Sequence, residues 1–175
     1  MYSRVKLFGH PIHPMVVACP IAFYTATLVA YALYQFGGQN AFWYDVGIAA
    51  NLAGVVMAVV AALPGFIDWA MGIPSDTEAK TVGLRHMLLN VVALVLFIVT
   101  YVLTYDNWHA TTRPGAGLPL VLALVGVLLT VAAGAHGWTL IQTHHVGVAG
   151  GDESETARAS ATPGRAGSRP AGTAR

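Results

Sequence analysis

The stretch Val91-Val92-Ala93-Leu94-Val95-Leu96-Phe97-Ile98-Val99 decides the fold, because it belongs to a run without Asp, Glu, Lys or Arg between Arg85 and Asp106. A helix rises about 1.5 Å per residue, so such a run can cross the roughly 30 Å of hydrocarbon in a bilayer. Three other stretches have the same character, and loops rich in Gly, Pro and Asn separate them. The predicted spans are residues 14–36, 43–67, 83–105 and 117–142.

The composition of the whole chain agrees with a membrane protein. Of its 175 residues, 55% are hydrophobic and only 10% are charged, against about a quarter charged in a soluble domain. This excludes an ordinary soluble enzyme and a nucleic-acid-binding protein. A single cysteine, Cys19, excludes a disulfide framework and a thiolate zinc or iron–sulfur site. Because backbone groups in lipid need internal partners, and no alternating barrel segments occur, we predict an all-α, integral membrane, up-down four-helix bundle.

The charges predict the domain boundary and the orientation. Residues 1–148 form the transmembrane domain, and the Ala-, Gly-, Ser- and Arg-rich residues 149–175, without aromatic side chains, predict a disordered cytoplasmic tail. Positive charges gather on one side of the spans: Arg4, Lys6, Lys80, Arg85 and Arg158, against Arg113 alone on the other. This bias predicts a multi-pass protein of the plasma (inner) membrane with both termini in the cytoplasm. The outer aromatic belt consists of Trp43, Tyr44, Tyr101, Tyr105 and Trp108.

Small residues predict how the helices pack. They recur in the second span at Gly47, Gly54, Ala58, Ala61, Ala62 and Gly65, and in the fourth at Gly126, Thr130, Gly134 and Gly137. Such stripes let helix backbones approach closely, or leave room for a flat ligand. Pro20 is expected to bend the first span. Asn51 and Asn90 are expected to form hydrogen bonds between helices.

The candidate functional residues lie in the cytoplasmic half. Six of the seven histidines fall there: His10, His13, His86, His136, His144 and His145. Asp68 lies at the end of the second span, and Asn90 lies one turn beyond His86 on the same helix face. His86 and His136 lie about 5 and 9 Å inside the hydrocarbon, a similar depth. Ionisable groups inside a membrane indicate a function.

Three chemistries suit these residues. Haem b could be bound between helices with His86 as one axial ligand and His136 or His13 as the other, Asn90 beside His86 and Arg85 paired with a propionate. A transition metal ion could be bound by His10, His13, His86 and Asp68. Imidazoles could also relay protons, because they titrate near neutral pH. Alternatively, the same histidines are only structural hydrogen-bonding groups.

Several motifs resemble a bacterial membrane family called domain of unknown function 2231. Gly9-His10-Pro11-Ile12-His13-Pro14-Met15 resembles its opening, and Gly65-Phe66-Ile67-Asp68-Trp69 resembles its second-helix end. Gly83-Leu84-Arg85-His86 with Asn90 is similar to its third-helix start, and His144 to Val148 to the segment that closes its fourth helix. The resemblance covers residues 7 to 148. It implies a four-helix membrane protein, and relatives fused to a Rieske domain imply a link to electron transfer.

The leading hypothesis is therefore a haem b-binding electron-transfer subunit with its site at the cytoplasmic end. Its partners would be the lipid bilayer and a redox protein or quinone, without nucleic acid, and the lipid-facing surface is compatible with a homodimer. The alternatives are a non-catalytic membrane scaffold or assembly partner, and transition-metal binding or transport. No activated nucleophile pattern occurs, which favours a redox or binding subunit over a stand-alone catalyst.

Overall fold

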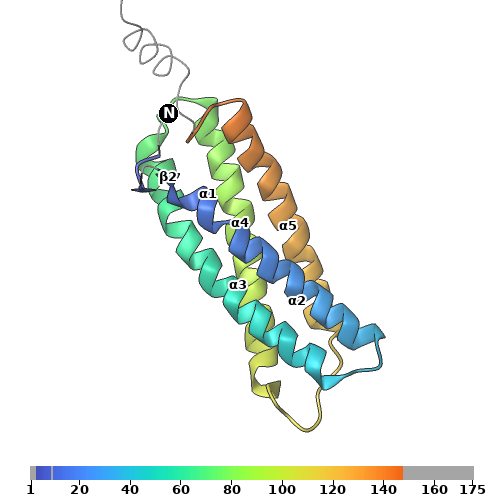
Figure 1. Cartoon of the computed structure of the whole chain (residues 1–175). Coiled ribbons are helices and arrows are strands. Elements are labelled where there is room, and N and C mark those ends of the chain that lie inside the picture. The colour runs from blue at the N-terminus through green and yellow to red at the C-terminus, as the bar shows by residue number, and fades with distance from the viewer. Residues whose placement is uncertain (1–2, 9, 148–175) are drawn as a thin grey trace, which may run out of the picture.

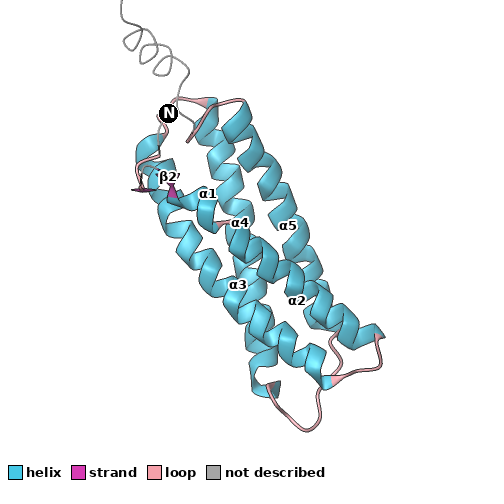
Figure 2. Cartoon of the chain, in the orientation of Figure 1, coloured by secondary structure: helices cyan, strands magenta, loops and turns pink. Residues whose placement is uncertain are grey.

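A computed structural model of the chain describes residues 3–8 and 10–147 as a bundle of long helices (Figures 1 and 2). The long helices are α2 (Ala18–Phe36), α3 (Ala41–Ile67), α4 (Glu78–Thr104) and α5 (Gly117–Gln142). The short elements are strands β1 (Lys6–Leu7) and β2 (His10–Pro11), helix α1 (Ile12–Val16), a π-helical turn (Asp68–Gly72) and a 3₁₀ turn (Tyr105–Asn107). Residues 149–175, predicted to be a disordered tail, lie outside the described residues.

The four predicted spans are confirmed. Among the residues that the structure describes, four helical segments are long and apolar enough to cross a membrane: Ile12–Phe36, Ala41–Gly72, Glu78–Asn107 and Gly117–Gln142. Helix α4 begins earlier than the predicted residue 83, because the hydroxyl of Thr77 accepts the Lys80 backbone N–H at 3.3 Å. This N-cap satisfies a donor that the first helical turn leaves free.

The first span is interrupted, as its proline predicted. The α-helix breaks at Val17, between α1 and α2. Pro20 has no N–H to donate to the carbonyl of Val16, and its ring crowds that carbonyl, so the break lies one turn before the proline. The interruption is local: Val17 keeps right-handed helical dihedral angles and its N–H donates to the His13 carbonyl at 3.0 Å, so α1 and α2 belong to one apolar segment, Ile12–Phe36.

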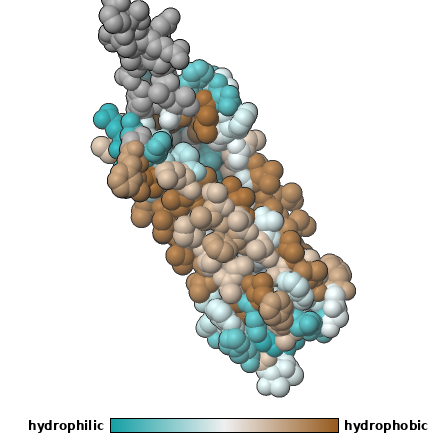
Figure 3. Space-filling model, in the orientation of Figure 1, coloured by the Kyte–Doolittle hydropathy of each residue, from teal (hydrophilic) through white to brown (hydrophobic). Residues whose placement is uncertain are grey.

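The helices form two close pairs, α2 with α3 and α4 with α5, and contacts of α5 with α2 and of α3 with α4 close the bundle. The N-terminal hairpin and the end of α5 lie at the same end of the molecule (Figure 1). Apolar side chains cover the middle of the visible face and polar ones its two ends (Figure 3). Large apolar residues of α5 such as Leu128 and Val131 are 59% and 66% exposed, as expected of a surface that contacts lipid.

Most glycines of the small-residue stripes pack against a ring from another helix. A Cβ at Gly47 would lie 2.6 Å from the Tyr31 ring, and one at Gly126 would lie 2.5 Å from the Phe97 ring. Gly134 differs, because a Cβ there would meet nothing within 4 Å. The stripes therefore serve for packing: they make room for flat side chains of this chain itself.

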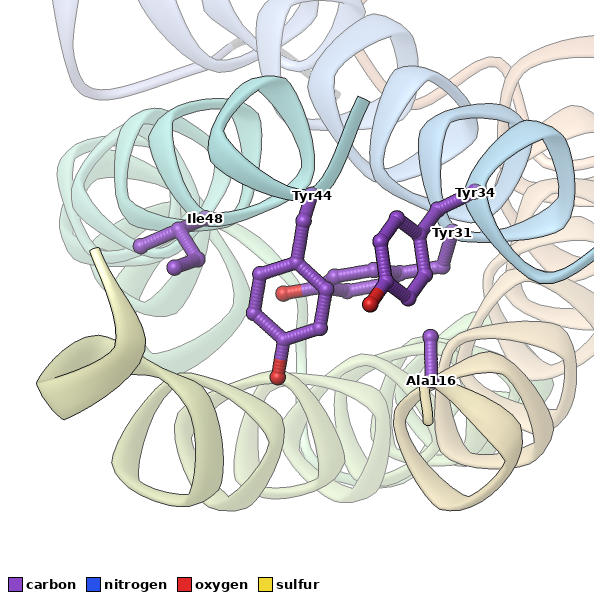
Figure 4. Close-up of a cluster of buried hydrophobic side chains, with 5 residues drawn as sticks. All are labelled: Tyr31, Tyr34, Tyr44, Ile48 and Ala116. Atoms are coloured by element: carbon purple, nitrogen blue, oxygen red, sulfur yellow. The ribbon is translucent and has the colours of Figure 1, made fainter. Parts of the chain in front are cut away.

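One residue of the predicted aromatic belt belongs to the core instead. Tyr44 is 1% exposed and packs with Tyr31, Tyr34, Ile48 and Ala116. Figure 4 shows the rings of Tyr31 and Tyr34 from α2 gathered with that of Tyr44 from α3. The sequence placed Tyr44 at the correct depth, but the rotation of α3 turns it inward.

Candidate functional site

His13 lies on the short helix α1 and reaches across to α3. Its Nδ1 is 2.9 Å from the carbonyl oxygen of Ala61. Its ring packs on Gly65, where a Cβ would come within 2.8 Å of Nδ1. The missing side chain of Gly65 leaves space for the imidazole.

His86 has the corresponding arrangement between α4 and α5. Its Nδ1 is 2.7 Å from the carbonyl oxygen of Ala133, and its ring lies against Gly137. The side-chain amide of Asn90 donates to the His86 carbonyl at 2.9 Å and lies 3.3 Å from His86 Nε2. Asn90 therefore forms hydrogen bonds within its own helix. The prediction that it bonds to another helix is wrong.

The two imidazoles lie against each other. Their ring centroids are 6.1 Å apart and their planes are nearly perpendicular, at 88°. A carbonyl oxygen can only accept a hydrogen bond, so each Nδ1 carries a hydrogen. In the neutral form of each ring, the lone pair is then on Nε2. This end of the bundle therefore offers two neighbouring imidazoles with Nε2 as the acceptor atom, and the Asn90 amide nitrogen lies 3.3 Å from that of His86.

The other predicted haem-site residues lie nearby without joining the pair. His136 is half-buried on α5, one turn from Ala133, whose carbonyl oxygen bonds to His86 Nδ1. Arg85 precedes His86 on α4, so the two side chains point about 100° apart around the helix, and Arg85 is exposed. Of the two proposed companions of His86, His13 is therefore the one in ring contact.

Asp68, predicted as a metal ligand, is occupied by the N-terminal segment. Its carboxylate accepts the Ser3 hydroxyl at 2.7 Å and the backbone N–H groups of Arg4 and Val5 at 2.6 and 3.2 Å. His10 is exposed on β2, beside a shallow pocket lined by prolines and Met15. Within residues 3–8 and 10–147, no three His, Cys, Asp or Glu side chains are grouped so that they could hold a metal ion.

Sequence reasoning missed the role of Lys80. Its ammonium group donates to the carbonyls of Trp69, Ala70 and Ile73 at 2.5, 3.4 and 3.3 Å and lies 4.1 Å from the centre of a Trp69 ring. These carbonyls belong to the end of the π-helical turn, where no further helical turn supplies donors. Lys80 therefore caps the helix that ends at Gly72, in addition to adding positive charge at this end.

An ion pair at the opposite end was also missed. Arg113 donates to both carboxylate oxygens of Asp45, at 2.8 and 2.7 Å, and to the Ala110 carbonyl at 2.6 Å. The Arg113 side chain is only 8% exposed. The signal in the sequence was an acidic and a basic residue at the same end of a bundle with few charges.

The family of the chain is shown by a match along most of its length rather than by one site. The family described as "Predicted membrane protein (DUF2231)" matches residues 9–150. The chain belongs to this family. The DUF2231 match includes all four helical spans and both histidines of the pair. No curated protein and no solved structure matches the chain.

Proposed function

We propose that this DUF2231 protein is a haem b-binding subunit that transfers single electrons, with His13 and His86 as the axial ligands. The observation that carries the proposal is the pair of imidazoles 6.1 Å apart, each with Nδ1 at the carbonyl of another helix. A bound haem b supplies reversible one-electron chemistry at its iron.

The imidazole pair fits axial ligation. Metal–imidazole nitrogen distances are about 2 Å, so two imidazoles that held one iron from opposite sides would have centroids roughly 6 Å apart. A hydrogen bond from Nδ1–H to a carbonyl orients the ring and leaves Nε2 as the ligand atom. The Asn90 amide nitrogen lies 3.3 Å from His86 Nε2 and orients its lone pair. If His86 Nε2 held the iron, this contact with Asn90 would be lost.

The number of ligands favours haem over an isolated metal ion. A porphyrin brings four nitrogen ligands of its own and needs only two from the protein. A zinc site usually needs three or four protein ligands, and the described residues contain no group of that size. The contacts of Asp68 with the N-terminal segment also remove one member of the metal set.

The site is proposed to face the cytoplasm of a bacterium. The charges Arg4, Lys6, Lys80 and Arg85 all lie at the histidine end of the spans, and such a bias favours the cytoplasmic side. Arg85, exposed beside His86, would pair with a haem propionate at the membrane edge. The electron partner would be a quinone or a soluble redox protein that reaches this end.

A visible spectrum of the purified protein tests the proposal. The full chain, expressed with an adequate haem supply and purified in detergent, should show a Soret band, and dithionite should sharpen the α and β bands. A spectrum without these bands overturns the haem proposal. Metal analysis of the same sample then tests transition-metal binding, and a blank result in both measurements favours a membrane scaffold.

Single substitutions test the ligand pair. His86→Ala and His13→Ala should each abolish the bis-histidine spectrum, because each removes one axial nitrogen. His109→Ala is the matched control, since His109 lies at the opposite end and its side chain is 79% exposed. His136→Ala separates the two candidate ligands: loss of the spectrum there, with His13→Ala unchanged, would assign the second position to His136.

A further inference from the structure

The core of the bundle contains a polar side chain without any partner. Among the described side chains, the buried nitrogen and oxygen atoms without a hydrogen bond are both amide atoms of Asn51 and the Tyr24 hydroxyl. Asn51 is 0% exposed, so its expected hydrogen bond between helices is absent. A primary amide with no partner is costly in protein or lipid, because neither replaces the hydrogen bonds of water.

Ring contacts on α2 and α3 define the level at which Asn51 lies. The ring of Tyr24 packs against Gly54, and the ring of Tyr31 packs against Gly47. Asn51 follows Gly47 by four residues and precedes Gly54 by three, so it lies on the same face of α3 between the two rings. By the same spacing, the α2 residue between the two tyrosines is Thr27.

Helix α4 presents a third polar residue at this level. The Tyr24 ring stacks on Phe97 with centroids 3.6 Å apart, and the Tyr31 hydroxyl donates to the Thr104 hydroxyl at 3.2 Å. Thr100 lies between these two α4 residues, three after Phe97 and four before Thr104, and therefore at the level of Asn51.

Helix α5 contributes only the methyl group of an alanine to this level. Phe97 packs on Gly126 of α5, and the residue one turn from that glycine toward the same end is Ala123. The level thus consists of four small or medium side chains, all 0% exposed: Thr27, Asn51, Thr100 and Ala123. Layers of aromatic rings close it on both sides.

The two threonines retain acceptor capacity. The Thr27 hydroxyl donates to the Phe23 carbonyl and the Thr100 hydroxyl to the Leu96 carbonyl, each at 2.8 Å. A hydroxyl oxygen that donates its hydrogen still has lone pairs. This level therefore contains two hydroxyl oxygens that can accept a hydrogen bond and one amide group that can donate and accept. It contains no large side chain.

We propose that this level is a binding site for water inside the membrane-spanning bundle, with Asn51 as its anchor. Water is the smallest ligand that both donates and accepts, and a buried water molecule typically has two to four polar partners. It would accept from Asn51 Nδ2 and donate its two hydrogens to the hydroxyl oxygens of Thr27 and Thr100. The site is separate from the histidine pair and does not depend on haem.

Nuclear magnetic resonance of the full chain in detergent or nanodiscs tests this site. The chain has only four asparagines, Asn40, Asn51, Asn90 and Asn107, so selective ¹⁵N labelling of asparagine gives a simple side-chain amide spectrum. Asn51→Leu identifies the Asn51 signals by their loss. Cross-peaks from the Asn51 amide protons to water support the site. Cross-peaks only to threonine hydroxyl protons, or none to water, overturn it.

Conservative substitutions make the test specific. Thr100→Val and Thr27→Val keep the side-chain shape but remove acceptor oxygens, and each should weaken or abolish the water cross-peak of Asn51. Thr130→Val is the matched control, because its hydroxyl also donates to an i−4 carbonyl, that of Gly126, outside this level. Water cross-peaks that persist unchanged in both the Thr27 and Thr100 variants overturn the proposed site.

Discussion

At the residue scale, the glycines and the rings explain each other. His13, Tyr24 and Tyr31 each occupy the space above one glycine of α3, and Phe97 and His86 each occupy the space above one glycine of α5. Helix association in lipid depends on close contacts, since apolar surface gains little by leaving lipid for protein. A ring that lies flat on the backbone of a glycine supplies such close contacts, and it does so at one defined position of the helix.

Two glycine substitutions within α5 test whether glycines that pack against rings stabilise the bundle. Gly126→Ala should lower the free energy of unfolding by about 1–3 kcal/mol, because its Cβ must displace the buried Phe97 ring. Gly134→Ala is the matched control, since its Cβ meets nothing within 4 Å and alanine favours a helix by about 0.5–1 kcal/mol. Denaturation in detergent measures both, and equal stabilities would contradict the packing role.

Asp68 anchors the N-terminal segment, because its carboxylate accepts hydrogen bonds from Ser3, Arg4 and Val5. Asp68→Ala should speed the hydrogen exchange of the Arg4 and Val5 amides tenfold or more, because bonds to a charged group contribute about 1.5–3 kcal/mol. Exchange measured by mass spectrometry on the N-terminal peptide is the readout. Asp76→Ala, at an exposed position, is the control, and identical exchange in both variants would contradict the anchor.

At the element scale, irregular segments position the important groups. At the histidine end, helix α1 places the His13 ring against that of His86, and His13 Nδ1 bonds to the Ala61 carbonyl of α3. At the other end, the connection from α4 to α5 is held by Arg113 on Asp45 and by the Tyr34 hydroxyl, which donates to the Pro114 carbonyl at 3.2 Å. Both segments are anchored by bonds to distant parts of the chain.

A double-mutant cycle tests the anchor of the α4–α5 connection. Asp45→Asn and Arg113→Gln should each cost about 1–3 kcal/mol of unfolding free energy, less than a fully buried pair, because Asp45 is 23% exposed. The double variant should lose less than the sum of the two, since the partners interact directly. Thr112→Ala, at an exposed position of the same connection, should change stability by less than about 0.5 kcal/mol. Strict additivity of the single costs would contradict the pair.

At the scale of the whole molecule, the chain separates its polar groups into two ends of different character. Six of the seven histidines and most cations of the described residues lie with the N-terminal hairpin, whereas the opposite end has His109, the tyrosine cluster and the Asp45–Arg113 pair. Arg113 is therefore neutralised by a partner, which strengthens the charge difference between the two ends.

Accessibility of single cysteines tests the proposed orientation. In a Cys19→Ser background, Thr112→Cys on the α4–α5 connection should react with a membrane-impermeant maleimide in spheroplasts. Ser75→Cys on the α3–α4 connection should react only after lysis, because that loop is on the cytoplasmic side in the proposed orientation. Both positions are exposed, so each serves as the control of the other. The reversed pattern would place the histidine end outside.

The sequence by itself determined the number of long apolar helices and the interruption of the first one before Pro20. These features depend on local quantities: the length of an apolar run against the thickness of a bilayer, and the missing N–H of one proline. It also predicted that ionisable groups gather at one end. A residue's position along a span and the alternation of the spans suffice for that.

Only the tertiary structure decided which of these groups meet. The contact of His86 with His13, the inward turn of Tyr44, the capture of Asp68 by the N-terminal segment and the Asp45–Arg113 pair all join residues far apart in the sequence. Each depends on how the helices rotate and shift against one another, and the contacts of rings with glycines set that rotation and shift. An apolar run in lipid fixes depth but leaves rotation free, because hydrocarbon surrounds every face of the helix equally.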